Sequence, residues 1–360
     1  MGDRFPILAI TGDRKKTAMS IEVNRPGLLT IPQDRGRTGY AHLGVGCAGA
    51  FDLPAFRLAN ALSGNQPDAC ALEITLLGPM LKFHADAWIA LTGAPVAAQV
   101  DEQPVSMWAP IFVRRGSTLA FGAMGQGCRA YLAVHGGFDF EPVLGSRSFD
   151  VNAALGPIGR PLRSGDVLKV REAGDKRGSG SFFTESLRAS LVSQKNEPDP
   201  LLKWSIDPRP WFDVDQGLPL RLFPGTHAHL LDAKSRGLLY TQSFRIAADS
   251  NRVGCRLEGE PLELAEPVEM VSEACVAGTV QLPPSGQPIA LGVEHPVSGG
   301  YPRIGQIAAA DLPRLAQRRP GDALRFAPCT LEEAQQALRE REQQLREMET
   351  IIANRLKQGA

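Results

Sequence analysis

Frequent glycine and proline residues constrain this chain more than any other feature. The 360 residues include 37 Gly and 28 Pro, which separate short apolar runs such as 88–92, 129–134 and 288–293. Short apolar runs bounded by turn residues are typical of β-strands joined by turns. Helical periodicity is confined to residues 52–62, a short turn at 309–316 and the C-terminal segment. The sequence therefore predicts a mainly β fold.

Length and repeated turns predict two β-rich domains. A chain of 360 residues exceeds the roughly 250 to 300 at which one hydrophobic core stops growing. Residues 163–170 (RSGDVLKV) and 319–326 (RPGDALRF) each form a Gly-Asp turn that leads into an alternating strand and closes a β-rich block. The predicted division is an N-terminal extension (1–18), an N-terminal β-rich domain (19–172), a linker (173–200), a C-terminal β-barrel domain (201–329) and a C-terminal helix (330–358).

The C-terminal segment predicts one long helix. Thr330 and Glu333 have the spacing of a capping box. Apolar residues then recur every seven positions at Leu331, Leu338, Leu345 and Ile352. We expect these four side chains to be buried against the chain's own domain or another protein. Arg341 and Arg355 occupy positions that a dimeric coiled coil would fill with apolar residues, which argues against a homodimer zipper.

Composition excludes several classes of protein. Lys plus Arg and Asp plus Glu each total 39, so the formal charge is zero and no basic surface for nucleic acid is predicted. No run approaches the ~20 apolar residues of a membrane span, and Phe5 to Ile10 followed by basic residues has the wrong order for a signal peptide. We therefore expect a cytoplasmic protein with no nucleic-acid or membrane partner. The six cysteines lack close Cys-x-x-Cys spacing and are expected to be reduced thiols.

Common cofactor motifs do not occur in the sequence. It lacks a phosphate-binding Gly-x-x-x-x-Gly-Lys-Ser/Thr loop, a His-Glu-x-x-His pair and a Gly-x-Ser-x-Gly elbow. It also lacks the Met-Lys pair at which biotin would be attached. We therefore predict no metal site and no cofactor held by this chain. If biotin is used, another chain carries it.

Two polar, glycine-rich segments are the candidate sites. The first, residues 33–40 (QDRGRTGY), continues to the start of the first helix. Gln33, Asp34, Arg37 and Asp52 are its candidate substrate-binding residues. An equally open interpretation is that Asp34 pairs with Arg37 to fix the loop and that Asp52 only caps the helix.

The second segment, residues 281–302, combines amide, carboxylate, imidazole, hydroxyl and phenol groups. Its candidates are Gln281, Gln287, Glu294, His295, Ser298 and Tyr301. Such groups can bind and polarise an amide or ureido group. A lone histidine after a strand is also commonly a structural residue, so both interpretations stay open.

At these segments the sequence resembles the family of the 5-oxoprolinase C subunits, which includes biotin-dependent carboxyltransferases, KipA-like proteins and the second-subunit domain of allophanate hydrolase. The matching motifs are 26–40 (PGLLTIPQDRGRTGY), 49–52 (GAFD), 59–60 (AN), 72–79 (LEITLLGP), 92–94 (TGA), 143–148 (VLGSRS), 250–259 (SNRVGCRLEG), 278–281 (GTVQ) and 300–302 (GYP). The resemblance spans about residues 21 to 356. The chain departs from the family's Asp-x-x-Thr-Thr-Gly-Gly-Tyr-Pro pattern at Glu294, Val297 and Ser298.

The resemblance implies cyclophilin-like β-barrel architecture and a site near the interface with a partner of the B-subunit type. It implies an ATP-dependent 5-oxoprolinase that opens 5-oxo-L-proline to L-glutamate, with ATP on a lactam-utilisation subunit. Arg252, Gln287, His295 and Tyr301 would then orient the substrate, and Glu294 or His295 would transfer protons. One alternative is a carboxyltransferase that uses biotin in trans to act on urea or a related amide. The other is a non-catalytic regulatory protein.

Overall fold

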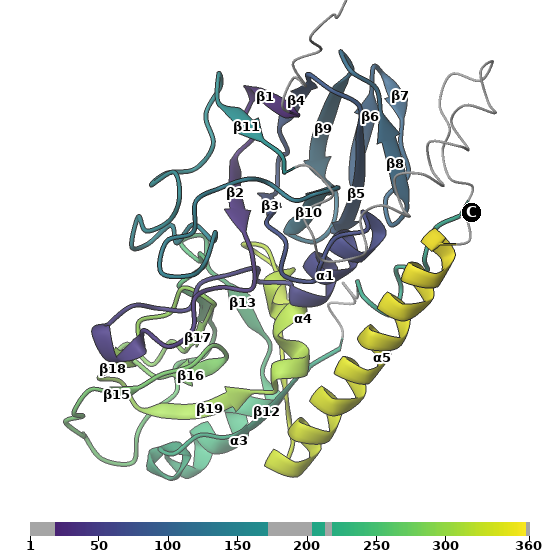
Figure 1. The fold of residues 1–360 in the computed structure, drawn as a ribbon. Coiled ribbons are helices and arrows are strands. Elements are labelled where there is room, and N and C mark those ends of the chain that lie inside the picture. Colours follow the sequence, from purple (N-terminus) through teal and green to yellow (C-terminus); the bar gives the residue numbers. More distant parts are fainter. Residues whose placement is uncertain (1–18, 172–203, 213–217, 358–360) are drawn as a thin grey trace, which may run out of the picture.

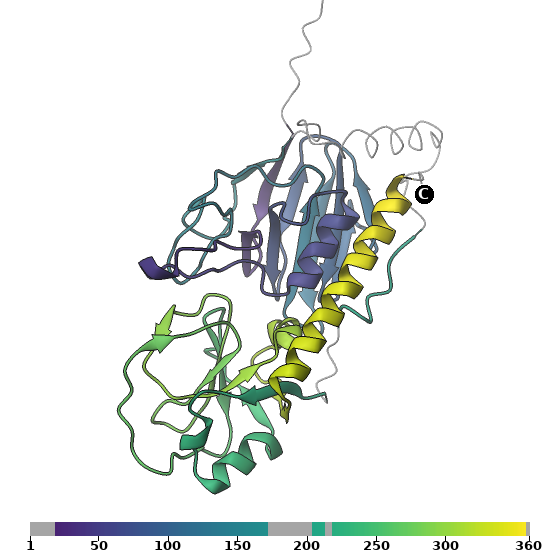
Figure 2. The same ribbon diagram turned by 60° about the horizontal axis from the view of Figure 1, so that its bottom comes forward.

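The computed structural model describes residues 19–171, 204–212 and 218–357 (Figure 1). The predicted N-terminal extension, 1–18, and linker, 173–200, lie outside these described residues. Figure 2 shows the N-terminal strands on one side of the molecule and the C-terminal strands on the other, with a long C-terminal helix running along both.

Two antiparallel sheets form the N-terminal part. Their strands are β1 (Ser20–Arg25), β2 (Leu29–Gln33), β3 (Ala71–Thr75), β4 (Met80–Phe83), β5 (Ala87–Gly93), β6 (Val96–Val100), β7 (Gln103–Pro104), β8 (Pro110–Val113), β9 (Thr118–Met124), β10 (Arg129–Val134) and β11 (Val167–Lys169). One sheet has the order β11-β1-β4-β9-β6-β7 and the other β2-β3-β10-β5-β8. Apolar side chains from both sheets form one shared core.

The second of these sheets is covered on both faces. In β5, Ile89 and Leu91 belong to the core shared by the two sheets, whereas Trp88 and Ala90 belong to a cluster beneath helix α1 (Leu53–Leu62). Residues of β5 and β10 are therefore buried along their whole length, which explains why both runs are continuously apolar in the sequence.

An eight-stranded sheet forms the C-terminal part. Its strands are β12 (Leu220–Pro224), β13 (Phe244–Ile246), β14 (Gly254–Glu258), β16 (Thr279–Gln281), β17 (Ile289–Leu291), β19 (Arg303–Ile307), β20 (Ala323–Leu324) and β21 (Phe326–Pro328). The order is β20-β13-β14-β17-β16-β19-β12-β21, and β15 (Glu273–Ala274) pairs separately with β18 (Ser298–Gly299). The two edge strands, β20 and β21, are separated in sequence only by Arg325, so the sheet curls into a nearly closed barrel.

The remaining short elements connect and cover the barrel. They are η1 (Ala41–Leu43), η2 (Ala228–Leu230), α3 (Ala233–Thr241), η3 (Ala309–Asp311) and α4 (Leu312–Ala316). The two repeated Gly-Asp turns have the same geometry, because the backbone N–H of Arg163 donates to Asp166 and that of Arg319 donates to Asp322, each at 2.8 Å. The predicted mainly β fold with a C-terminal helix is confirmed.

Helix α5 (Leu331–Lys357) begins with the predicted capping box. The N–H of Thr330 donates to the Glu333 carboxylate at 2.8 Å, and the N–H of Glu333 donates to the Thr330 hydroxyl at 3.1 Å. Burial of the heptad against the chain's own domain is confirmed in its second half. Leu345 and Ile352 are buried, whereas Leu331 is 48% exposed and Leu338 is 39% exposed.

The reason is that α5 packs against α1 mainly through its C-terminal half (Figure 2). Arg57 of α1, itself buried, makes ion pairs with Glu342 at 2.9 Å and Glu349 at 2.7 Å. Ile206 and Trp211, which precede the barrel, join the same apolar cluster. Within the described ranges, no helix is long and apolar enough to cross a membrane.

Candidate functional site

A cavity of about 560 Å³ lies between the N-terminal sheets and the C-terminal barrel. This volume is in the ~300–1,000 Å³ range of small-molecule sites. Polar groups from both parts line it, namely Arg129, Asn152, Ser250, Asn251, Arg252, Glu294 and Arg318. Three guanidinium groups in this set are balanced by the carboxylates of Glu294 and of the adjacent buried Glu73, so one positive charge remains in excess and the cavity favours a ligand with negative charge.

Arg252 joins the two parts of the molecule. Its guanidinium makes an ion pair with Glu73 of β3 and another with Glu294 at 2.5 Å, and its Nη2 donates to the Gly49 carbonyl at 2.6 Å. The side chain is buried, and these contacts use all three of its nitrogens. Gly292 lets its backbone pack closely against that of Arg252, because a Cβ there would lie 2.3 Å from the Arg252 carbonyl oxygen. Arg252 is therefore a bridge between the two parts.

Glu294 completes the bridge from the barrel side. Its second carboxylate oxygen accepts the backbone N–H groups of Val151 at 3.1 Å and Asn152 at 3.3 Å. These two residues belong to the N-terminal part and also line the cavity. The carboxylate thus has only one edge toward the cavity, and it fixes the loop that forms the opposite wall.

Glu73 is the acidic centre of the N-terminal side. It is fully buried and accepts hydrogen bonds from the Tyr131 hydroxyl at 2.8 Å and the Phe51 N–H at 3.0 Å. Burial alone would raise the pKa of Glu73, but the guanidinium groups of Arg252 and Arg129 hold it below its ordinary value. Glu73 is therefore ionised and keeps two guanidinium groups beside the cavity.

Asp52 has a structural position at the start of α1. Its carboxylate accepts the Ala55 N–H at 3.1 Å, which confirms the predicted helix cap, and also accepts the Gln317 side-chain amide at 2.7 Å. Burial raises the pKa of Asp52 to about 6. Gln317 lies beyond α4 and also bonds the backbone of Cys128 and Arg129. Asp52 therefore takes part in the contact between the two parts and does not line the cavity.

Asp34 and Arg37 fix the first glycine-rich loop. Asp34 accepts hydrogen bonds from the hydroxyls of Ser146 at 2.6 Å and Ser148 at 2.7 Å, and from the Arg147 N–H at 2.6 Å. Arg37 is buried and its Nη2 donates to the Ser148 carbonyl at 2.5 Å. Both side chains therefore hold the loop against residues 146–148 and not primarily through pairing with each other.

Some polar atoms of Arg37 and Gln33 are buried without a hydrogen bond to any residue that the structure describes. Among the described residues, Nε and Nη1 of Arg37 and Oε1 of Gln33 have no hydrogen-bond partner. The Gln33 amide nitrogen donates to the Phe149 carbonyl at 2.7 Å. Buried donors of this kind are normally bonded by water or a ligand. Gln33 and Arg37 therefore keep their place as candidate binding residues.

The remaining predicted residues lie outside the cavity. His295, Ser298 and Tyr301 are on an exposed loop that includes β18, where the His295 ring contacts the Pro296 carbonyl at 2.9 Å. Gln281 is buried and donates to the Cys275 sulfur at 3.4 Å. Gln287 bonds both backbone groups of Gly259 at 2.9 and 3.1 Å, so it fastens the end of β14.

The two glycine-rich segments nevertheless touch. A Cβ on Gly46 would lie 3.3 Å from the His295 carbonyl oxygen. Figure 1 shows η1 of the first segment beside β18 of the second. The structure therefore places these two segments on one surface, while only Arg252 and Glu294 of the predicted residues reach the cavity.

Sequence reasoning missed Glu73, Arg129 and Tyr131. A carboxylate in the apolar run 71–75 and a guanidinium at the start of the run 129–134 are the available signals, because buried charges need partners. The signals do not identify those partners, since Arg252 comes from a distant part of the chain. No group of three or more His, Cys, Asp or Glu that could hold a metal occurs among the residues described here.

The chain belongs to the family described as carboxyltransferase domain, subdomain A and B, which matches residues 43–328. The family predicted from the sequence motifs is thereby confirmed.

Named relatives fall into two groups. The chain is 36% identical to the 5-oxoprolinase C subunit of Escherichia coli, over 92% of this chain and 97% of that protein. It is 34% identical to the 5-oxoprolinase C subunit of Haemophilus influenzae, over 89% and 94%. The solved structure of the K. lactis urea amidolyase superimposes with a TM-score of 0.75 at 28% identity, over 91% of this chain and 20% of that one. The chain therefore spans about a fifth of the urea amidolyase.

Proposed function

We propose that this protein is one component of an ATP-dependent 5-oxoprolinase, which opens 5-oxo-L-proline to L-glutamate. The observation that carries the proposal is the match along 97% and 94% of two separate 5-oxoprolinase C subunits. The urea amidolyase match covers only a fraction of a larger protein. A chain that matches C subunits over nearly their whole length is expected to act with further subunits.

The cavity has the chemistry that such a substrate requires. 5-Oxoproline carries one carboxylate and one lactam, and Arg129, Arg252 and Arg318 give the cavity an excess of positive charge. Because Arg252 already binds two carboxylates and a carbonyl, we assign it the task of holding the walls in place. Ser250 and Asn251 supply neutral hydrogen-bonding groups on the barrel side.

The exposed loop supplies a second set of groups. His295, Ser298 and Tyr301 are accessible, and we propose that a partner of the B-subunit type covers them and completes the site. A lactam is a poor electrophile, so the reaction is expected to transfer the γ-phosphoryl group of ATP to the lactam oxygen. Water then attacks the activated carbon and the ring C–N bond breaks, which leaves an acyl phosphate of glutamate, and a second water hydrolyses this acyl phosphate to L-glutamate and phosphate. ATP is assigned to the lactam-utilisation subunit, since this sequence has no phosphate-binding loop.

The second candidate is transfer of a carboxyl group from biotin to urea or a related amide, which the urea amidolyase structure favours. The two reactions differ in what they consume. A purified complex with 5-oxoprolinase activity forms glutamate from 5-oxoproline and ATP in bicarbonate-free buffer, and avidin does not inhibit it. Dependence on bicarbonate together with inhibition by avidin would instead establish the carboxyltransferase.

We further propose that the isolated chain is inactive. The absence of a phosphate-binding loop and of a biotin attachment site from the sequence supports this. Turnover of 5-oxoproline by the isolated chain at the rate of the complex would reject it.

A further inference from the structure

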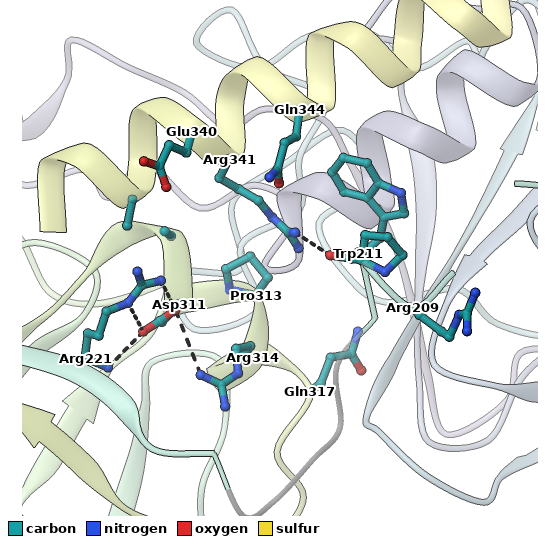
Figure 3. Close-up of a pocket in the computed structure, with 13 residues that line it drawn as sticks. Arg209, Trp211, Arg221, Asp311, Pro313, Arg314, Gln317, Glu340, Arg341 and Gln344 are labelled. Atoms are coloured by element: carbon teal, nitrogen blue, oxygen red, sulfur yellow. Dashed lines mark hydrogen bonds and ion pairs between the residues drawn. The ribbon is translucent and has the colours of Figure 1, made fainter. Parts of the chain in front are cut away.

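A second pocket lies beneath α5, and its lining shares no residue with that of the cavity described above. It has a volume of about 370 Å³ and is formed by α5, α4 with η3, β12 and residues 209–211 (Figure 3). On α5 it is lined by Ala337, Glu340, Arg341 and Gln344. Their spacing places these four on one face of the helix. The volume is within the range of small-molecule sites, ~300–1,000 Å³.

The pocket is rich in guanidinium groups. Four arginines line it, Arg209, Arg221, Arg314 and Arg341, together with two carboxylates, Asp311 and Glu340. They come from four separate segments of the chain, and Figure 3 shows them around a common space. The lining therefore carries two more positive than negative charges, although the whole protein has a formal charge of zero.

Protein contacts hold several of these guanidinium groups in place. Arg221 donates to Asp311 through Nε at 3.0 Å and Nη2 at 2.6 Å. Arg314 donates to the Pro219 carbonyl at 3.0 Å. Arg341 donates to the Pro210 carbonyl and lies over the Trp211 ring, 4.9 Å from its centroid. Guanidinium groups fixed in this way can bind an oxyanion with little loss of conformational entropy.

Apolar groups form the rest of the wall. Trp211, Pro210, Pro313 and Ala337 line the pocket beside the arginines. The space is larger than a single phosphate or carboxylate group requires, so the ligand has an organic body as well as its charge. We propose that this pocket binds a small organic dianion, either a phosphate monoester or a dicarboxylate. This inference does not depend on the proposed 5-oxoprolinase activity.

The experiment is isothermal titration calorimetry on the full chain at low salt. The probes are phenyl phosphate and succinate, with phenol and succinamide as their uncharged counterparts. We expect saturable binding of at least one dianion that weakens with added sodium chloride, and no binding of its uncharged counterpart. Tighter binding of phenyl phosphate assigns the site to phosphate monoesters, and tighter binding of succinate assigns it to dicarboxylates.

Substitutions at two exposed residues of the pocket should change the affinity for a dianion in opposite directions without altering the core. Glu340→Gln removes a negative charge and should tighten dianion binding about tenfold, whereas Arg209→Gln should weaken it by a similar factor, about the effect of one charge on a dianion ~6 Å away in water. Glu347→Gln is the matched control. Gln343 donates to Glu347 at 2.9 Å just as Gln336 donates to Glu340 at 2.7 Å, but Glu347 does not line the pocket.

The outcomes separate clearly. Opposite shifts in affinity for Glu340→Gln and Arg209→Gln, with Glu347→Gln unchanged, support the site. Absence of saturable binding by both dianions would overturn the proposal. Equal binding of charged and uncharged probes, or equal responses of all three variants, would overturn it as well.

Discussion

Replacing Arg252 with methionine tests the role of the buried ion pairs. The substitution keeps the volume of an unbranched side chain but removes the partner of Glu73 and Glu294. Glu73 retains Arg129 at 3.4 Å and the Tyr131 hydroxyl, whereas Glu294 retains only the backbone N–H groups of a loop. Breaking a buried pair by removing one partner costs ~3–5 kcal/mol, which is the loss of unfolding free energy we expect.

Urea denaturation followed by circular dichroism measures this loss. Arg256→Met is the matched control, because Arg256 lies on β14 soon after Arg252 and makes an exposed ion pair with Asp249 at 2.9 Å. That pair should contribute less than ~1 kcal/mol. Adding Glu294→Gln to Arg252→Met should restore part of the stability, since it removes the uncompensated charge. Equal, small losses of unfolding free energy for Arg252→Met and Arg256→Met would refute the role of Arg252 as a bridge between the two parts of the molecule.

Three further predictions concern stability. Burial raises the pKa of Asp52 from 3.8 to about 6, so the folded state binds this proton more tightly than the unfolded state, and stability rises as pH falls through about 6. Between about pH 7 and about pH 5 the unfolding free energy of the wild type should rise by ~1 kcal/mol relative to that of Asp52→Asn. A wild-type minus variant difference that is the same at both pH values in urea denaturation would contradict this. Leu345→Ala should lower the unfolding free energy by ~2–5 kcal/mol because Leu345 is buried, whereas Leu338→Ala should lower it by less than about 1 kcal/mol because Leu338 is half-exposed. Asp34→Asn should lower the melting temperature in a thermal scan, because the carboxylate accepts four hydrogen bonds, and an unchanged value would argue for a binding role instead.

The β strands, the terminal helix and its cap could be predicted because local signals determine them. Continuous apolar runs identify strands such as β5 and β10, and Thr330 with Glu333 identifies the start of α5. The exposure of Leu331 and Leu338 could not be predicted in this way. A heptad shows which residues share a helix face but not how far the neighbouring helix extends.

The cavity could be predicted only in part. Glu294 stood out because it lies in a polar, glycine-rich segment, and Arg252 because it lies in a motif of the family resemblance, and both line the cavity. Glu73, which pairs with Arg252, lies in β3 of the N-terminal part, and its pairing depends on how the two parts of the molecule meet. Asp34 illustrates the opposite case, since the same polar, glycine-rich pattern serves to fix a loop. Composition alone does not distinguish a binding loop from one held by its own hydrogen bonds.

The most direct test of the central claim is to omit this chain from a reconstituted complex and then add it back. Neighbouring subunits from the same source, supplied with 5-oxo-L-proline and ATP, should form glutamate only after the wild-type chain is added. Ala248→Phe, which places a ring at an exposed position of the cavity wall, should restore assembly but little activity, whereas Ala97→Phe, at an exposed position of β6 outside the cavity, should restore both. Glutamate formation at the full rate without this chain would contradict the account.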